Sequence, residues 1–160
     1  MWKGTRVLIT GGRGFLGRHL VSKLNDRGAD PVAVGRAEAD LTDRDQTRRL
    51  FEDVRPTVVF HCAVQGGGIG WMQEHPVESG RDNALINLHA LDAAHQSGAE
   101  LFVGASSTCC YPGKRPDPGC AGEGVNGLPV ATHGVDGGCM LRMFEWGGGV
   151  WVSLIQGGGW

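Results

Sequence analysis

The sequence Thr10-Gly11-Gly12-Arg13-Gly14-Phe15-Leu16-Gly17 decides the expected fold of this chain. Three of its glycines, Gly11, Gly14 and Gly17, have the spacing G-x-x-G-x-x-G. The apolar run 6–10 precedes the segment and predicts a buried strand, whereas apolar residues at helical spacing follow it as far as the Arg27-Gly28 stop. Glycines between a strand and a helix let the backbone approach the pyrophosphate of a dinucleotide, and the helix N-terminus offers free N–H groups. An ordinary glycine turn is the alternative interpretation.

The same alternation of strand and helix continues along the chain. Short apolar runs predict strands over 31–34, 57–62 and 101–105, and the segments between them predict helices over 44–54, capped by Asp43, and over about 77–96. A glycine-rich loop is expected over 65–70. Near-continuous apolar strands alternating with helices predict an α/β fold, a Rossmann-like doubly wound parallel sheet with helices on both faces.

Glycine is unevenly distributed between the two parts of the chain. Of the 28 glycines in 160 residues, 15 lie in 1–118 and 13 in the 42 residues of 119–160. We expect one domain over 1–160, with 1–118 as its well-patterned core and 119–160 as an atypical glycine-rich region. There, a loop over 113–134, a helix over 139–146 and a strand over 150–155 are predicted.

Composition excludes several classes of protein. The net charge is −2 with no basic block, so nucleic acid is not an expected partner. No apolar run approaches the ~20 residues of a membrane helix, and no cleavable signal precedes the first strand, so a soluble cytoplasmic protein is expected. The five cysteines form no C-x-x-C pair, so no metal site is expected.

Two arginines bear on the identity of the dinucleotide. The strand over 31–34 is followed by Gly35-Arg36. An acidic residue at this place would favour NAD by holding the ribose hydroxyls. A second arginine, Arg13, lies inside the glycine turn. Two guanidinium groups converging there suit a 2′-phosphate and favour NADP(H) over NAD. The alternative is that both arginines are solvated surface side chains.

Further candidates follow the later strands at the same sheet edge. Asp40-Leu41 could contact adenine, or Asp40 could simply support its turn. The small residues Cys62-Ala63-Val64 would let a cofactor pass, and His61 is either part of the site or a satisfied core histidine. A hydroxyl or thiol in 106–110 could bond a substrate carbonyl or move a proton, although a polar strand-end turn is the alternative.

Together these segments resemble the extended short-chain dehydrogenase/reductases and, among them, the GDP-L-fucose synthase branch. The resemblance rests on 10–17, Asp40-Leu41-Thr42-Asp43, Gly67-Gly68-Ile69-Gly70-Trp71 and Ser107-Thr108-Cys109-Cys110-Tyr111-Pro112. It implies hydride transfer from NADPH to a GDP-sugar, GDP-4-keto-6-deoxymannose. Ser107 would bond the C4 carbonyl, Cys109 would exchange protons at C3 or C5, and Asn83 would support the network around the cofactor. Family precedent also implies a homodimer that pairs through the helices near 77–96 and 139–146.

The chain departs from this family at the catalytic helix. The family's Tyr-x-x-x-Lys pair falls on Asp136 and Met140, or on Gly137 and Leu141 in a register shifted by one. An aspartate ionised near pH 7 has no proton to donate. Family members are roughly twice as long, so their C-terminal substrate subdomain is expected to be missing. Four interpretations remain: an impaired nucleotide-sugar epimerase/reductase, a non-catalytic NADP(H)-binding module, a truncated relative, or another NAD(P)-dependent sugar-nucleotide epimerase or dehydratase.

Overall fold

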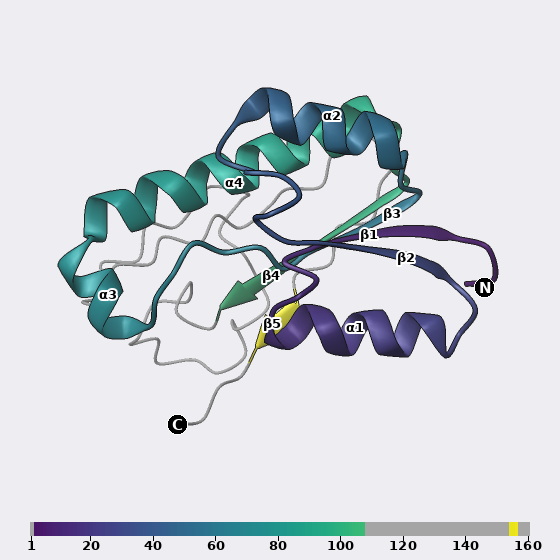
Figure 1. Ribbon diagram of the computed structural model, residues 1–160, viewed down its shortest axis with the longest axis horizontal. Helices are drawn as coiled ribbons and strands as arrows, with labels where there is room; N and C mark the ends of the chain where they lie inside the picture. Colours follow the sequence, from purple (N-terminus) through teal and green to yellow (C-terminus); the bar gives the residue numbers. More distant parts are fainter. Residues whose placement is uncertain (1, 108–153, 157–160) are drawn as a thin grey trace, which may run out of the picture.

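The computed structural model describes residues 2–107 and 154–156, which form a parallel sheet with helices packed against it (Figure 1). The sheet order is β2-β1-β3-β4-β5. The elements, in chain order, are β1 (Arg6–Thr10), α1 (Phe15–Asn25), β2 (Asp30–Val34), α2 (Arg44–Val54), β3 (Val58–His61), α3 (Ile69–Glu74), α4 (Pro76–Gln96), β4 (Leu101–Ser107) and β5 (Leu154–Gln156).

β1 lies between β2 and β3 in the sheet. Thr10, its last residue, is in register with Val34 of β2 on one side and with His61 of β3 on the other. The carboxyl ends of the three strands are therefore level. Because the chain leaves β1 for β2 and later returns to β3 on the opposite side, the strand order reverses between β1 and β3, which is where open α/β sheets bind ligands.

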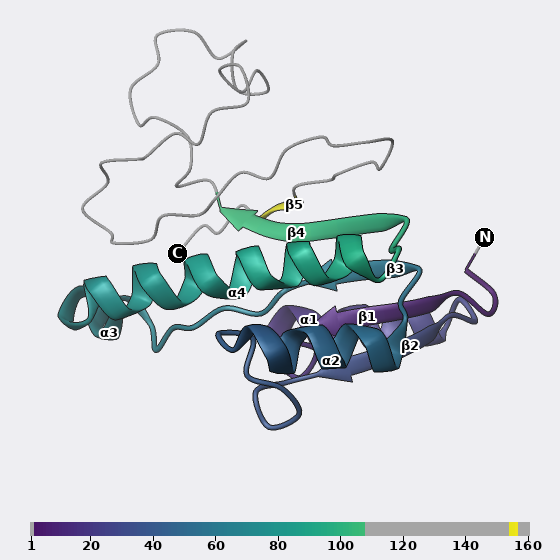
Figure 2. The same ribbon diagram turned by 90° about the horizontal axis from the view of Figure 1, so that it is seen from above.

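Two apolar layers cover the two faces of the sheet. α1 packs on one face, where Leu24 joins Val7 and Ile9 of β1. α2 and α4 pack on the other, where Leu8 of β1 meets Phe51 and Ala90. Figure 2 shows α2 and α4 side by side. Successive residues of a strand point to opposite faces, so the continuous apolar run of β1 supplies both layers. This arrangement confirms the predicted doubly wound α/β fold.

Local signals in the sequence set the helix ends. Asp43 caps α2, since its carboxylate accepts hydrogen bonds from the backbone N–H groups of Asp45 and Gln46. Gly28 and Gly98 follow α1 and α4 with φ of 75° and 76°, a conformation that favours glycine. Both glycines therefore lie where the chain turns from the end of a helix into the next strand.

The structure differs from the sequence expectations at several boundaries. The prediction of a loop over 65–70 is wrong at its last two residues, because a short helix, α3, begins at Ile69 after Gly68, whose φ is 89°. β4 continues two residues beyond the expected end at Ala105, to Ser107, and pairs there with β5. The loop expected over 113–134 and the helix expected over 139–146 lie outside the described residues.

Among the described residues, no helix is both long enough and apolar enough to cross a membrane.

Candidate dinucleotide site

The glycine turn between β1 and α1 leaves no room for side chains at two of the three glycines of the G-x-x-G-x-x-G pattern. A Cβ on Gly11, whose φ is 65°, would lie 2.7 Å from the backbone carbonyl of Cys62 at the end of β3. A Cβ on Gly17 would overlap the carbonyl oxygen of Gly11 and lie 2.5 Å from Cα of Gly12. These contacts bring the first turn of α1 directly onto the end of β1 and bring β3 beside it.

Gly14 has a different role in the same turn. It is the N-cap of α1, in an extended conformation, and no side chain caps the helix. An added Cβ there would lie 3.1 Å from the Gly11 carbonyl oxygen, a tight contact, but less severe than those at Gly11 and Gly17. The absence of a side chain also leaves the N–H groups and the positive dipole end of α1 open to an anion.

A cavity of about 220 Å³ lies beside this turn. Eight of the candidate residues line it, namely Gly11, Gly14, Arg36, Asp40, Leu41, Cys62, Ala63 and Val64, joined by Gln65 and by Ile86 of α4. The structure thus brings together segments that follow β1, β2 and β3. Arg13, Phe15, Leu16, Gly17 and Asn83 are not among the lining residues; Phe15 is largely exposed at the start of α1.

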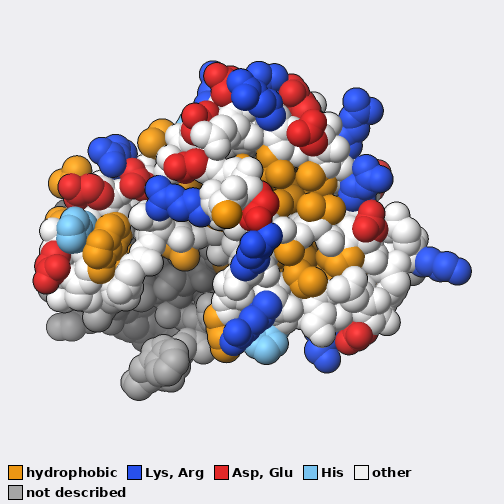
Figure 3. Space-filling view, viewed as in Figure 1, with side chains coloured by type: hydrophobic (Ala, Val, Ile, Leu, Met, Phe, Trp, Pro, Cys, Tyr) orange, Lys and Arg blue, Asp and Glu red, His pale blue; other side chains and the backbone are white. Residues whose placement is uncertain are grey.

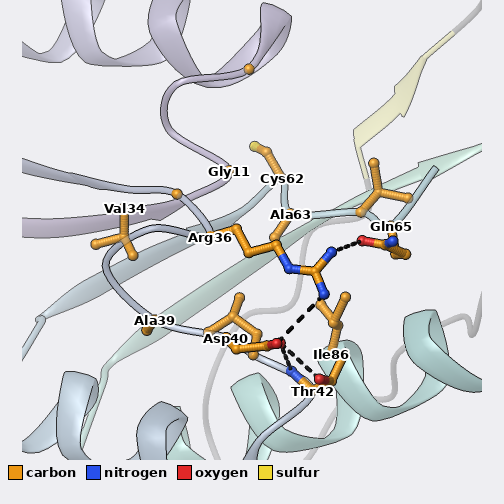
Figure 4. Close-up of a pocket in the computed structure, with 14 residues that line it drawn as sticks. Gly11, Val34, Arg36, Ala39, Asp40, Thr42, Cys62, Ala63, Gln65 and Ile86 are labelled. Atoms are coloured by element: carbon orange, nitrogen blue, oxygen red, sulfur yellow. Dashed lines mark hydrogen bonds and ion pairs between the residues drawn. The ribbon is translucent and has the colours of Figure 1, made fainter. Parts of the chain in front are cut away.

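Arg36 lies across the mouth of this cavity (Figure 4). Its guanidinium donates to Oε1 of Gln65 at 2.9 Å and forms an ion pair of 3.6 Å with Oδ2 of Asp40. The other carboxylate oxygen of Asp40 accepts hydrogen bonds from the hydroxyl and backbone N–H of Thr42, at 2.7 and 3.0 Å. The hydroxyl bond is the largest cause of a lowered pKa for Asp40, which therefore stays ionised. Asp40 therefore supports the turn at Thr42, which is one of the two interpretations that the sequence left open.

Arg13 is paired with an acidic residue that the sequence analysis did not consider. Its guanidinium contacts Oε1 of Glu38, while Oε2 of Glu38 accepts a 2.8 Å hydrogen bond from the backbone N–H of Gly35. An acidic side chain therefore does reach the end of β2, from a residue three positions after Gly35. The signal was the spacing Gly-x-x-Glu, because a glutamate three residues into a turn reaches back to the N–H of its first residue.

The two arginines are neither isolated charges nor buried. About two thirds of each side chain is exposed, and each carries one carboxylate partner. Figure 3 shows the same pattern on a larger scale, since Lys and Arg side chains are interspersed with Asp and Glu over this face. The two arginines expected to meet one phosphate are thus each paired with a carboxylate. These two ion pairs form a charged rim, since Arg36 and Asp40 line the cavity and Arg13 and Glu38 lie against Gly35, another lining residue.

A buried hydrogen-bonded chain fixes the ends of β1 and β3. His61 donates from Nε2 to Oδ1 of Asn87 on α4 at 3.0 Å, because that oxygen can only accept. Its Nδ1 then accepts from the hydroxyl of Thr10 at 2.7 Å. Burial lowers the pKa of His61 to about 4, so its ring is neutral at pH 7. The interpretation of His61 as a satisfied core histidine is confirmed.

The residues after His61 line the cavity with small or apolar groups. Burial raises the pKa of the Cys62 thiol to about 11, so it stays protonated and behaves as a small apolar group. Val64 is 60% exposed, which is high for a valine beside a cavity. This segment offers an apolar surface at the carboxyl edge of the sheet.

Asn83 of α4 holds the loop that follows β3. Its Oδ1 accepts from the backbone N–H of Gln65, and its Nδ2 donates to the Gln65 carbonyl, both at 2.8 Å. A third bond of 2.8 Å ties Nδ2 to the carbonyl of Ser79. Asn83 therefore acts on the cavity through Gln65, the residue that also bonds Arg36.

The expected catalytic residues lie at or beyond the limit of the description. Ser107 ends β4 at the same sheet edge. Cys109, Asp136 and Met140 lie outside the described residues. Across residues 2–107 and 154–156, no group of three or more His, Cys, Asp or Glu side chains is placed to hold a metal ion.

Comparison with known proteins identifies relatives. The model of the NAD dependent epimerase/dehydratase family matches residues 7–134. A GDP-L-fucose synthase of Dictyostelium discoideum is 34% identical over 115 residues, which are 70% of this chain and 36% of the relative. A GDP-L-fucose synthetase of Naegleria fowleri bound to NADP has a TM-score of 0.64 at 28% identity, over 74% of this chain and 38% of that one. The UDP-glucose 4-epimerase of Thermus thermophilus, in complex with NAD, has a TM-score of 0.62 at 31% identity, over 72% of this chain and 43% of that one.

These relatives confirm the Rossmann-like fold and the expected resemblance. They are also longer than this chain. It spans about 36% of the length of the first curated relatives that it matches.

The neutral, buried His61 predicts a specific dependence of stability on pH. Its pKa is about 4 in the folded chain against the usual 6.5 of a histidine side chain, so below pH 6.5 the unfolded chain takes up a proton that the folded chain does not. The free energy of unfolding should therefore fall as the pH is lowered from 6.5 to 4, with a contribution from His61 of about 3 kcal/mol. Urea unfolding of the wild type and His61→Gln at pH 4.5 and 7 measures it.

The quantity compared is the loss of stability between the two pH values. His61→Gln should lose less than the wild type, whatever its stability at pH 7. His19→Gln, which changes an exposed histidine, should lose as much as the wild type. An equal loss in the wild type and His61→Gln would contradict the assignment of a neutral His61.

Proposed function

We propose that this chain, which belongs to the NAD dependent epimerase/dehydratase family, binds NADP(H) and derives from a GDP-L-fucose synthase-type epimerase/reductase of nucleotide sugars. The observation that carries the proposal is the glycine turn at the end of β1. Its backbone is too tightly packed for side chains at Gly11 and Gly17, and Gly14 leaves the N-terminus of α1 open beside the cavity. An anionic pyrophosphate is the chemistry that such a turn binds.

The other lining residues suit the remaining parts of the dinucleotide. Arg36 and Arg13 would take the 2′-phosphate, since guanidinium groups bind phosphate oxygens in pairs. Asp40 and Leu41 would border the adenine. Cys62, Ala63 and Val64 offer the apolar surface past which the rest of the cofactor would lie, while Asn83 would hold their loop in place.

Arg36, rather than the shared fold, favours NADP(H) over NAD. The Naegleria fowleri protein carries NADP and the Thermus thermophilus protein carries NAD, so the shared fold alone does not choose between them. Arg36 lines the cavity after β2 and is mostly exposed, and its two present partners are a neutral amide and a carboxylate at 3.6 Å. A phosphate dianion would compete well with both.

The proposed substrate is a GDP-sugar, and the residues for its conversion are incomplete. NADPH, when bound, supplies the hydride. Ser107, at the end of β4, would bond the carbonyl of the sugar and Cys109 would exchange protons beside it. The proton donor is the deficient part, because Asp136 and Met140 occupy the positions of the family's tyrosine and lysine. We therefore propose binding of the cofactor without efficient turnover.

A homodimer through α4 is a further part of the proposal. Val77 and Leu88 are 72% and 52% exposed on this helix. They lie three turns apart, which places them near one face, and exposed apolar side chains on one helix face favour pairing with a second helix.

Light scattering should give a dimer mass for the wild type and a monomer mass for Leu88→Glu. A monomeric wild type would contradict the proposal.

NADPH should bind more tightly than NADH, and Arg36 should account for much of the difference. Removing a guanidinium that bonds a phosphate costs roughly 1.5 kcal/mol or more, so Arg36→Gln should weaken NADPH binding about tenfold and leave NADH nearly unchanged. Titration followed by nicotinamide fluorescence measures both affinities.

Arg48→Gln is the matched control, because Arg48 is a surface arginine of α2 that is ion-paired with Glu52 and absent from the cavity lining. It should bind both cofactors as the wild type does. Equal affinity of the wild type for NADPH and NADH would refute the assignment of Arg36.

Turnover of GDP-4-keto-6-deoxymannose should be negligible in this chain. The position of the family's proton donor holds Asp136, which is ionised near pH 7, so the alkoxide formed by hydride transfer has no adjacent acid. NADPH oxidation, followed by absorbance, should not exceed the rate without the sugar nucleotide. Rapid oxidation that is lost in Ser107→Ala would show instead that the chain is a competent reductase.

A further inference from the structure

We infer that Glu38 is a specificity-determining residue that limits the preference of this site for NADP(H) over NAD(H) by neutralising Arg13. The inference rests on the proposed cofactor function and concerns the same site. It arises from a juxtaposition of two opposite charges at the end of β2, the strand end that distinguishes the two cofactors in dinucleotide-binding folds.

The geometry places the carboxylate of Glu38 back at the strand end, although the residue lies four positions beyond Val34. Oε2 accepts the backbone N–H of Gly35 at 2.8 Å, and the backbone N–H of Glu38 donates to the Gly35 carbonyl at 3.2 Å. These two bonds close the turn at both ends. The carboxylate is therefore held by the backbone, and Arg13 comes to it from the glycine turn.

Arg13 is correspondingly positioned by Glu38. Its guanidinium contacts Oε1, and its side chain lies over Gly35, where an added Cβ would be 3.5 Å from Cδ of Arg13. Only about a third of the Glu38 side chain is exposed, against two thirds for Arg13. The more buried partner of the pair is thus the acid, which the turn fixes independently of the arginine.

Opposite consequences follow for the two cofactors. A 2′-phosphate that binds Arg13 has to displace Glu38 or accept its negative charge nearby, and both weaken the binding of NADP(H). A ribose 2′-hydroxyl, in contrast, can donate to a carboxylate, which is how acidic residues at this strand end favour NAD. Glu38 therefore opposes the preference that Arg13 and Arg36 create.

Glu38→Gln isolates the charge from the shape. The amide oxygen of glutamine can still accept the N–H of Gly35, so the turn keeps its hydrogen bond, while the negative charge beside Arg13 is removed. Freeing Arg13 from an exposed ion pair should tighten NADPH binding about threefold to fivefold. NADH binding should stay the same or weaken, so the ratio of the two affinities should shift toward NADPH by at least about threefold.

The experiment is a titration of the full chain with NADPH and with NADH, followed by nicotinamide fluorescence at low ionic strength. Four proteins are compared: the wild type, Glu38→Gln, Arg13→Gln and the double variant. In the Arg13→Gln background the Glu38→Gln substitution should no longer tighten NADPH binding, because the arginine that Glu38 neutralises is gone. Glu38→Ala should shift the ratio in the same direction and serves if Glu38→Gln folds poorly.

Glu52→Gln is the charge-matched control. It also removes a carboxylate from an arginine ion pair, of 2.7 Å with Arg48, but on α2 away from the cavity lining. It should leave the ratio unchanged, whereas a ratio that shifts as in Glu38→Gln would mean that net charge alone is responsible and would overturn the inference.

Two other results separate the inference from the function on which it rests. In the first, the wild type binds NADPH, but Glu38→Gln and Glu38→Ala leave the ratio of the NADPH and NADH affinities within about twofold of the wild-type ratio. This result would overturn the role of Glu38 alone. Failure of the folded wild type to bind either cofactor would overturn the proposed function itself.

Discussion

The close approach of α1 to the ends of β1 and β3 positions the other parts of this site. Gly17 contacts the Gly11 carbonyl so tightly that a methyl group would overlap it, and Gly11 meets the backbone of Cys62 in the same way. Because no side chains separate these segments, the helix N-terminus and two strand ends converge on one small region. The cavity, the loop after β3 and the charged rim all lie beside that point of convergence.

Polar groups in the interior keep this arrangement in register. The chain from Thr10 through His61 to Asn87 connects β1, β3 and α4 at the level of the cavity. Asn83, one helical turn earlier on α4, holds the Gln65 backbone by two bonds. Buried polar groups are costly unless they are satisfied, so these bonds specify one position of α4 against the sheet. α4 thereby determines where the loop after β3 lies.

Charge pairing gives the rim a weaker and more adjustable character than the interior. The ion pairs of Arg13 with Glu38 and of Arg36 with Asp40 are partly solvated, and exposed pairs contribute little to stability. Each arginine can therefore exchange its carboxylate for another anion at small cost. The packed glycine turn would thus supply the site for the pyrophosphate, while the choice between related dinucleotides would depend on these exchangeable pairs.

Sequence patterns predicted the strands and helices of 6–107 other than α3, the cap at Asp43, the glycine stops and the glycine turn, because each depends on neighbours within a few residues. It also indicated most of the residues that line the cavity, since parallel strands end at a common edge. Only the tertiary structure decided the partners of the charged and polar side chains: Glu38 returns to Gly35 and meets Arg13, Gln65 joins Arg36 to Asn83, and His61 is neutral between Thr10 and Asn87. Most of these contacts join residues far apart in the chain, and their electrostatic outcome depends on burial and distance, which no local pattern contains.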